Sequence, residues 1–140
     1  MALDNKQNMT VGKSFHQDSS FRQVTGSAAY IDDIPLPKNC LHGALVLSDI
    51  ASGTITSMDL REVRKLGFSC HIITAKDIPG KNDIAPIFSD EPILADKNVT
   101  YIGQPIALVL ASTMEKARLA ARKVKIKIKE KKNPILSLEK

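Results

Sequence analysis

Polar and apolar residues alternate most regularly near the end of the chain. Over residues 124–129 each lysine follows a β-branched residue. Successive side chains of a strand point to opposite faces, so this pattern predicts a strand with one buried face and one lysine face in solvent. Lysines on an outer face also discourage pairing between molecules. Residues 53–58 alternate in the same manner and predict another strand.

Other apolar segments are continuous rather than alternating. Residues 41–48 form such a run and predict a buried strand, because a run that is apolar at every position is typical of strands covered on both faces. Shorter segments predict further strands at residues 28–31, 70–74, 99–101 and 106–111.

The clearest helix signal lies just before the lysine strand. Ser112 followed by Glu115 is a capping box, and it predicts a helix over residues 114–123. The alanines of this segment fall on one helical arc together with Met114 and Val124. Such small side chains would let the helix lie close against a sheet.

Capping and turn residues predict two further segments. Asp59 and Gly67 bracket a short helix over residues 60–66. Residues 75–98 contain three prolines and a proline–glycine turn signal, so they predict a long loop. A loop of this length in a compact domain is generally functional or covered by a partner.

Together these elements predict one α/β (α+β) domain, with a single mixed sheet of five to seven strands and two helices. Residues 1–23 are polar without clear periodicity and predict an N-terminal arm, and residues 24–140 are assigned to the domain. A chain of 140 residues has no room for a second substantial core. Its 43% apolar and 25% charged content excludes a disordered chain.

The formal net charge of +5 is concentrated after residue 114. Two interpretations follow: a solvated strand face, or a surface that binds phosphate or nucleic acid. With 4% aromatic residues and no tryptophan, the chain is poorly supplied for stacking on bases. We therefore expect no nucleic-acid partner, and a small basic nucleic-acid-binding protein is the alternative. The lysines that would serve it are Lys125, Lys127, Lys129, Lys131 and Lys132.

The apolar segments of the chain do not indicate a membrane protein. The longest apolar run, residues 105–111, is too short to span a bilayer, which takes about 20 residues. The N-terminal residues contain no hydrophobic segment of the kind found in signal peptides. We expect a cytoplasmic protein with no membrane partner.

Residues that could carry chemistry are scattered along the chain. Asp32 and Asp33 are adjacent, but neighbours on an extended segment face opposite ways, so we interpret them as turn residues rather than as an acid/base pair. The histidines and cysteines lack metal-ligand spacing, and no nucleophile elbow or glycine-rich phosphate loop occurs. We expect no catalytic residue and no metal site, and Gly103 and Gln104 are weak candidates for cofactor or ligand contact. The histidines and cysteines are His16, His42, His71, Cys40 and Cys70.

Ordered blocks of residues between Val11 and Leu138 are specific when taken together and in register. The most telling are Asp-Ile-Pro-Gly-x-Asn-Asp at residues 77–83 and Tyr-x-Gly-Gln-Pro at residues 101–105. With them, the chain resembles the opening of the molybdopterin-binding subunit of bacterial xanthine dehydrogenases. Further blocks are Val24-Thr25-Gly26, Ala28-Ala29-Tyr30-Ile31-Asp32-Asp33, Leu41-His42-Gly43-Ala44 and Glu91-Pro92.

This resemblance implies the α/β hammerhead domain of the xanthine dehydrogenase and aldehyde oxidase family. Those enzymes hydroxylate purines or aldehydes with oxygen taken from water. Electrons pass from a molybdenum–pterin centre through two iron–sulfur clusters to FAD, and on to NAD or another acceptor. In that family the pterin contacts and the catalytic glutamate lie in a larger domain after the hammerhead, and the iron–sulfur cysteines lie in another domain or subunit.

The resemblance therefore implies no cofactor in this chain. It implies as partners the molybdopterin domain and the iron–sulfur and FAD domains or subunits of the same enzyme. The expected function is a structural, non-catalytic N-terminal domain of a xanthine dehydrogenase, which oxidises hypoxanthine and xanthine to urate. A free-standing interaction module is a further alternative. The chain ends near the place where the family's catalytic domain begins, so we expect these 140 residues alone to be inactive.

Overall fold

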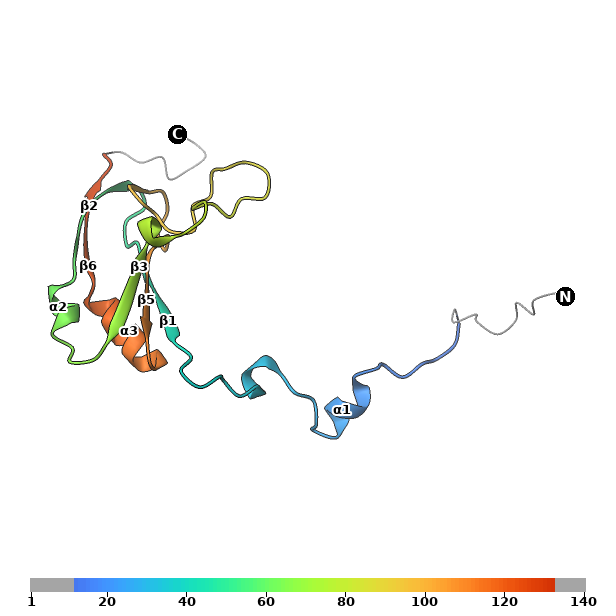
Figure 1. The fold of residues 1–140 in the computed structure, drawn as a ribbon. Coiled ribbons are helices and arrows are strands. Elements are labelled where there is room, and N and C mark those ends of the chain that lie inside the picture. Colours follow the sequence, from blue (N-terminus) through green and yellow to red (C-terminus); the bar gives the residue numbers. More distant parts are fainter. Residues whose placement is uncertain (1–11, 133–140) are drawn as a thin grey trace. The chain divides into compact units, whose positions relative to one another are not determined.

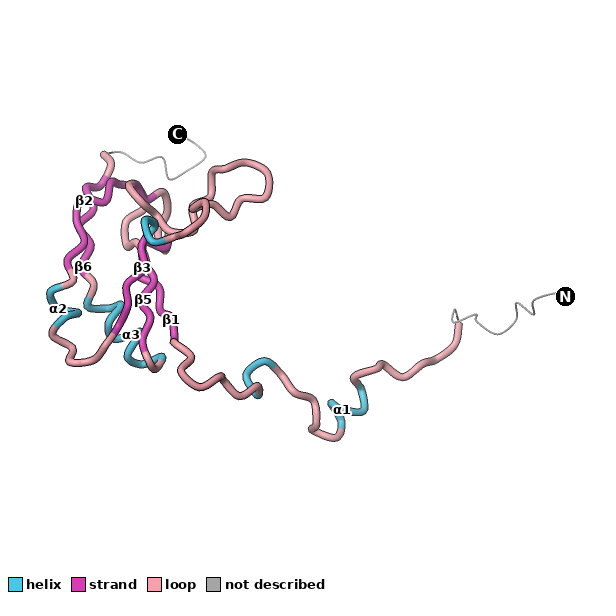
Figure 2. Tube along the Cα trace, viewed as in Figure 1, coloured by secondary structure: helices cyan, strands magenta, loops and turns pink. Residues whose placement is uncertain are grey.

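The computed structural model describes residues 12–132, and the chain divides into two compact units. The units are Met1–Pro37 and Lys38–Lys140. Figure 1 follows the fold along the chain, and Figure 2 shows that the strands of residues 12–132 all belong to the second unit.

The first unit contains a short helix and a 3₁₀ turn among its described residues. Helix α1 spans Ser20–Val24 and buries no side chain, and the 3₁₀ turn η1 spans Ile31–Asp33. The backbone N–H of Tyr30 donates to the Asp33 carboxylate at 3.0 Å. The predicted strand at residues 28–31 is wrong, because this local cap ends the extended backbone there. The polar pattern also failed to predict α1, which has no apolar stripe to signal it.

A three-stranded antiparallel sheet forms the first half of the second unit; we call it the first sheet. Its central strand is β5 (Pro105–Ala111), with β1 (His42–Leu47) on one side and β3 (Cys70–Thr74) on the other. The two faces of β1 differ, because its alternate residues are exposed. The prediction that residues 41–48 form a buried strand is therefore wrong for one of its faces.

A second antiparallel sheet of three strands forms the other half; we call it the second sheet. Its central strand is β2 (Gly53–Asp59), flanked by β4 (Asn98–Val99) and β6 (Lys125–Glu130). The lysines of β6 are exposed and its isoleucines are partly buried, which confirms the predicted alternation. Every strand predicted in residues 38–132 is present, although β4 shares only Val99 with the strand predicted at residues 99–101. The predicted single mixed sheet is wrong, because the six strands of these residues form two separate antiparallel sheets.

Each sheet contains one irregularity that turns side chains inward. On β2 the register shifts between Ile55 and Ser57, so that Met58 faces inward although strict alternation from Ile55 would face it outward. In the first sheet the register shifts opposite Ile106 and Ala107, and both of these consecutive residues are buried. Bulges of this kind insert one residue and rephase the side chains that follow.

Helix α3 (Met114–Lys123) covers the inner face of the first sheet. Its buried face consists of small residues, so the helix can lie close to the strands. The bounds of this helix agree with the prediction, but its cap does not. The N-cap is Thr113, whose Oγ1 accepts a hydrogen bond from the N–H of Lys116 at 3.2 Å, so the predicted cap at Ser112 is wrong by one residue. The buried residues of α3 are Ala117, Ala120 and Ala121.

Helix α2 (Arg61–Arg64) is shorter than the predicted helix at residues 60–66. Its only fully buried side chain is Val63, which joins the core beneath the first sheet. The carboxylate of Asp59 accepts a hydrogen bond from the N–H of Arg61 at 3.0 Å. The N-cap is Leu60, so the predicted cap at Asp59 is wrong by one residue, although its carboxylate bonds the first turn.

The long loop is present, and it is tied together at its base. After the 3₁₀ turn η2 (Ala75–Asp77), residues 78–97 form neither helix nor strand. The Asn82 side chain donates to the carbonyl of Leu94 at 2.8 Å and accepts from the N–H of Leu94 at 3.0 Å. Leu94 and Ala95 are buried, so this pair of bonds fixes the loop to the body of the unit.

Candidate functional site

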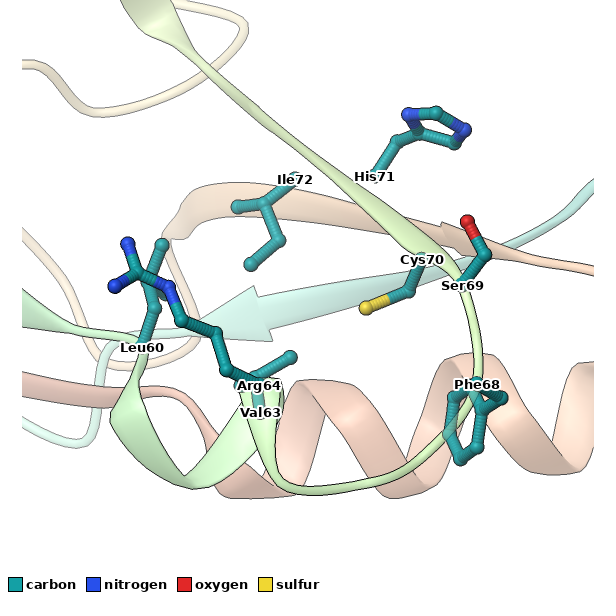
Figure 3. A pocket seen from close by; sticks show the side chains of 8 residues that line it. All are labelled: Leu60, Val63, Arg64, Phe68, Ser69, Cys70, His71 and Ile72. Carbon is teal, nitrogen blue, oxygen red and sulfur yellow. The ribbon is translucent and has the colours of Figure 1, made fainter.

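An open pocket of about 540 Å³ lies between α2 and β3 (Figure 3). Figure 3 shows Cys70 and Ile72 directed towards α2, whereas His71 points to the opposite side of the strand. This follows from the alternation of side chains along a strand. Cys70 and His71 are therefore not arranged as a nucleophile and its base. Polar and apolar atoms contribute about equally to the wall of the pocket, and its lining residues are Leu60, Val63, Arg64, Phe68, Ser69, Cys70, His71 and Ile72.

The two weak ligand candidates, Gly103 and Gln104, lie in the turn that enters β5. Gly103 has φ +86°, a left-handed conformation that favours glycine. The side chain of Gln104 is 2% exposed, and its Oε1 accepts from the N–H of Thr100 at 2.7 Å. The turn is joined to the end of β1, because Ser48 donates to the Gln104 carbonyl and accepts from the Gly103 N–H. These hydrogen bonds give both residues a structural role in holding the turn. Contact of either residue with a ligand stays a prediction.

The acidic pair Asp32 and Asp33 lies in η1 rather than on an extended segment. Asp33 accepts the hydrogen bond from Tyr30 already described, which is the work of a turn residue. The interpretation of this pair as turn residues is therefore confirmed, although the reason differs from the one expected.

The carboxylate with the strongest electrostatic surroundings is Asp59, at the end of β2. The Arg61 side chain donates to it at 2.7 Å, and this bond, together with the Arg61 N–H, holds the pKa of Asp59 well below its usual range. Lys125 of β6 acts in the same direction. In α2, the bond from Lys65 lowers the pKa of Glu62. Both carboxylates are thus kept ionised, which suits surface ion pairs and does not suit a general acid.

The outer side of the second sheet displays a row of lysines. We call it the lysine face and define it by Lys125, Lys127, Lys129, Thr54 and Thr56, all of which are exposed. The partners across the strands are short polar groups, and the Thr56 hydroxyl donates to the Lys127 carbonyl at 2.9 Å. The inner side of the same strands is formed by isoleucines and Met58.

The outer side of the first sheet has the opposite character. We call it the leucine face and define it by Leu45, Leu47, Leu108, Leu110 and Ile73. In the strand register Leu108 lies opposite both Leu45 and Ile73, so the three side chains form one row. Leu45 and Leu47 are 50% and 51% exposed. Within the described residues the rows of this face contain no Lys, Arg, Asp or Glu, and His71 lies opposite Leu110 at their edge.

Metal-binding residues are not gathered anywhere in the described part of the chain. Over residues 12–132, no group of three or more His, Cys, Asp or Glu side chains could hold a metal ion. Iron–sulfur clusters require sets of cysteine thiolates. Cys40 is exposed and Cys70 partly buried, and neither forms a disulfide. The described residues therefore do not fit an iron–sulfur cluster. In the same range no helix is long and apolar enough to cross a membrane.

Comparisons with known proteins agree with this fold. The family model for the α/β hammerhead domain of aldehyde oxidase and xanthine dehydrogenase matches residues 25–132. Xanthine dehydrogenase 1 of Arabidopsis thaliana is 43% identical over 125 residues, which are 89% of this chain and 9% of that protein. The xanthine dehydrogenase/oxidase of Gallus gallus is 42% identical over 131 residues, with coverages of 93% and 9%.

A solved structure supports the same assignment. The aldehyde oxidoreductase from Desulfovibrio desulfuricans ATCC 27774 matches with a TM-score of 0.75 at 32% identity, over 84% of this chain and 14% of that one. The fold and its surfaces define a hammerhead domain, as the resemblance implied. The chain belongs to the xanthine dehydrogenase and aldehyde oxidase family of molybdenum hydroxylases. It spans about a tenth of the length of the curated relatives it matches.

Two features escaped the sequence analysis. The leucine face was missed because the run at residues 41–48 was interpreted as covered on both sides. The Asn82 clamp was missed because an asparagine that bonds the backbone twelve residues away leaves no local signal. The pattern of residues 77–83 contained this asparagine, but the resemblance alone did not assign it a role.

Proposed function

We propose that this chain is the structural, non-catalytic N-terminal domain of a xanthine dehydrogenase. The whole enzyme would oxidise hypoxanthine and xanthine to urate, with electrons passed through iron–sulfur clusters and FAD. The observation that carries the choice of substrate is the identity of 40–43% to relatives named xanthine dehydrogenase, against 36–37% to relatives named aldehyde oxidase.

The side chains of the described residues support a structural role. The Cys70 and His71 side chains point to opposite sides of the strand, and Arg61 keeps Asp59 ionised. The side-chain oxygen Oε1 of Gln104 accepts a hydrogen bond from Thr100 within its own turn. None of these groups is poised as a nucleophile, a base or an acid in residues 12–132. We accordingly assign the molybdopterin contacts and the catalytic residues to polypeptide outside residues 1–140. We assign residues 24–140 to the hammerhead and residues 1–23 to an arm.

The partners belong to the same proposal. The molybdopterin domain and the iron–sulfur and FAD domains or subunits would surround this domain in the enzyme. The long relatives support this, because about nine-tenths of each lies outside the matching segment.

The test is made on the native assembly that contains this chain, purified from its natural source. We expect molybdenum, iron and FAD in that assembly, and reduction of NAD that depends on xanthine and hypoxanthine. Benzaldehyde serves as the matched aldehyde substrate and should be oxidised more slowly. Faster oxidation of benzaldehyde than of either purine would contradict the purine assignment.

The non-catalytic part of the proposal has its own control. The 140-residue chain produced alone should contain no molybdenum and should not oxidise hypoxanthine. Stoichiometric molybdenum in the chain alone, or turnover by it, would overturn the assignment of the redox chemistry to other polypeptide.

A further inference from the structure

The composition of the strands that form the leucine face indicates that this face is covered. Both β1 and β5 are apolar at nearly every position, a composition typical of strands buried on both sides. Their inner side chains meet α3 and the shared core, whereas Leu45 and Leu108 belong to neither core cluster, and Leu45 borders an open hollow beside Arg118 and Arg122 of α3. The neighbouring sheet shows the contrast, because β6 alternates and its outer side is lysine.

The base of the long loop adjoins one end of this face. Leu47 lies opposite Pro105 in the strand register, and the Pro105 carbonyl accepts from the N–H of Ala95 at 2.8 Å. Ala95 follows Leu94, which the Asn82 side chain clamps. In Figure 1 the loop extends from the top of the first sheet towards the side opposite β2 and β6.

The tip of the loop is also apolar. Ile87 and Phe88 are 81% and 74% exposed, and Ile84 is exposed beside them. The tip is held from within, because the N–H of Ile84 donates to the Glu91 carbonyl at 2.9 Å and Lys81 bonds both Asp83 and Ser89. A preformed loop that displays large apolar side chains has little entropy left to lose when a partner covers it.

We propose that the leucine face and the loop tip Ile84, Ile87 and Phe88 form one docking surface. Its occupant is polypeptide of the same enzyme lying outside residues 1–140, presenting an apolar surface with a recess for Phe88. The inference rests on the proposed function and identifies the side of the domain by which it is held. The lysine face, on the other sheet, faces solvent in the assembled enzyme.

Two observations favour this occupant over a second copy of the chain. The relatives place about nine-tenths of their length outside this domain, which supplies ample surface for a permanent interface. Permanent interfaces between parts of one assembly are apolar at their centre. The leucine face is apolar apart from His71, which lies at its edge opposite Leu110. The projecting loop tip needs a complementary recess, and a flat face paired with its own copy does not provide one.

The decisive experiment is hydroxyl-radical footprinting of the native assembly, because the chain contains its own reference. Leu119, on α3, is 44% exposed and has the same chemistry and nearly the same exposure as Leu45 and Leu47. We expect Leu45, Leu47 and Phe88 to be oxidised at least about fivefold less than Leu119, since a docked interface excludes water from its centre. Lys127 should be acetylated as readily as a free surface lysine. Equal oxidation of Leu45, Leu47 and Leu119 overturns the proposal.

A pair of variants in the same assembly tests the contact by a second route. Leu45→Lys places a charge in the docking surface, and we expect it to release the other polypeptides of the enzyme during purification. Leu119→Lys makes the same change at a matched exposure and should leave the assembly intact. An intact assembly with Leu45→Lys, or protection of Leu45 in a preparation that contains only copies of this chain, overturns the proposal.

Failure here is distinguishable from failure of the proposed function. Molybdenum content and xanthine oxidation are measured on the same preparation. If both are present while Leu45 and Leu47 are freely oxidised, the docking surface is wrong and the proposed function stands. If both are absent, the proposed function fails whatever the footprint shows.

Discussion

The two sheets of the second unit are built alike and end in opposite surfaces. Each has three antiparallel strands, and each contributes one side to a shared interior. The outer side of the second sheet is the lysine face, and the outer side of the first is the leucine face. Strand geometry is the same in both, so the difference reflects what each outer side meets. We infer that the outer side of the second sheet faces solvent and that the outer side of the first sheet is covered by a protein surface in the assembled enzyme.

The sheets differ also in how closely their strands are locked. In the second sheet, a Cβ on Gly53 would lie 2.8 Å from the backbone oxygen of Lys129 and 2.6 Å from the Ile128 side chain. In the first sheet, a Cβ on Gly43 would meet only side chains, of which Leu108 is nearest at 3.1 Å. Backbone cannot move aside as a leucine side chain can. The second sheet therefore tolerates less change at its glycine.

The largest expected effect tests that difference directly. Gly53→Ala should lower the free energy of unfolding by about 2 kcal/mol, because β6 must shift away from β2. Gly43→Ala should change it by less than about 1 kcal/mol, since the lost backbone freedom of the unfolded chain offsets the crowding. Urea denaturation of the two variants gives the comparison. Equal losses would mean that the two sheets are equally locked.

A smaller effect is expected at the loop that adjoins the leucine face. Asn82→Ala removes both hydrogen bonds to the buried backbone of Leu94, at a cost of about 1–2 kcal/mol to local closure. Amide hydrogen exchange at Leu94 should then quicken roughly tenfold.

The matched control for the loop lies in the second sheet. Asn98 accepts one bond from the Thr54 hydroxyl at an exposed position, so Asn98→Ala should change stability by less than about 0.5 kcal/mol. If amide exchange at Leu94 is unchanged in Asn82→Ala, the two hydrogen bonds of Asn82 do not fix the base of the loop.

The smallest effect is a dependence on acid. The folded pKa of Asp59 is lowered by Arg61, so its contribution is present above the unfolded value and is lost as pH falls through the folded one. The free energy of unfolding should therefore decline as pH falls below about 4. As pH is lowered, hydrogen exchange of the β2 and β6 amides should quicken at a higher pH than exchange of the β1 and β5 amides. The variant Asp59→Asn should flatten the decline in the urea midpoint. An unaltered acid profile in that variant would assign the decline to other carboxylates.

Prediction from the sequence was best where the alternation of polar and apolar residues is strong and local. The lysine strand and the helix at residues 114–123 have strong periodic signals, and both are present as predicted. Local capping was harder, because Ser112 and Thr113 are both acceptable caps and only the backbone geometry selects Thr113. The expected strand at residues 28–31 failed for a similar reason, since β-propensity there competes with the turn that Asp33 stabilises.

The candidate site was predicted less completely than the fold. The position of Gly103 and Gln104 at the entry of a strand was foreseen, but the bond from Thr100 that occupies Gln104 depends on a turn that the sequence does not specify. The leucine face could be found only by comparing the apolar composition of β1 with its observed exposure. That comparison requires the strand register, which no local pattern supplies.

What the sequence determined by itself is the set of strands in residues 38–132, the helix at residues 114–123 and the lysine side of β6. These are properties of neighbouring residues, because side-chain direction repeats every two residues in a strand and every three to four in a helix. Tertiary structure decided how the strands are divided between two sheets, which bulges turn Met58 and Ile106 inward, and which apolar side is left open. Those outcomes depend on contacts between residues far apart in the chain, and such contacts form only when the whole unit is assembled.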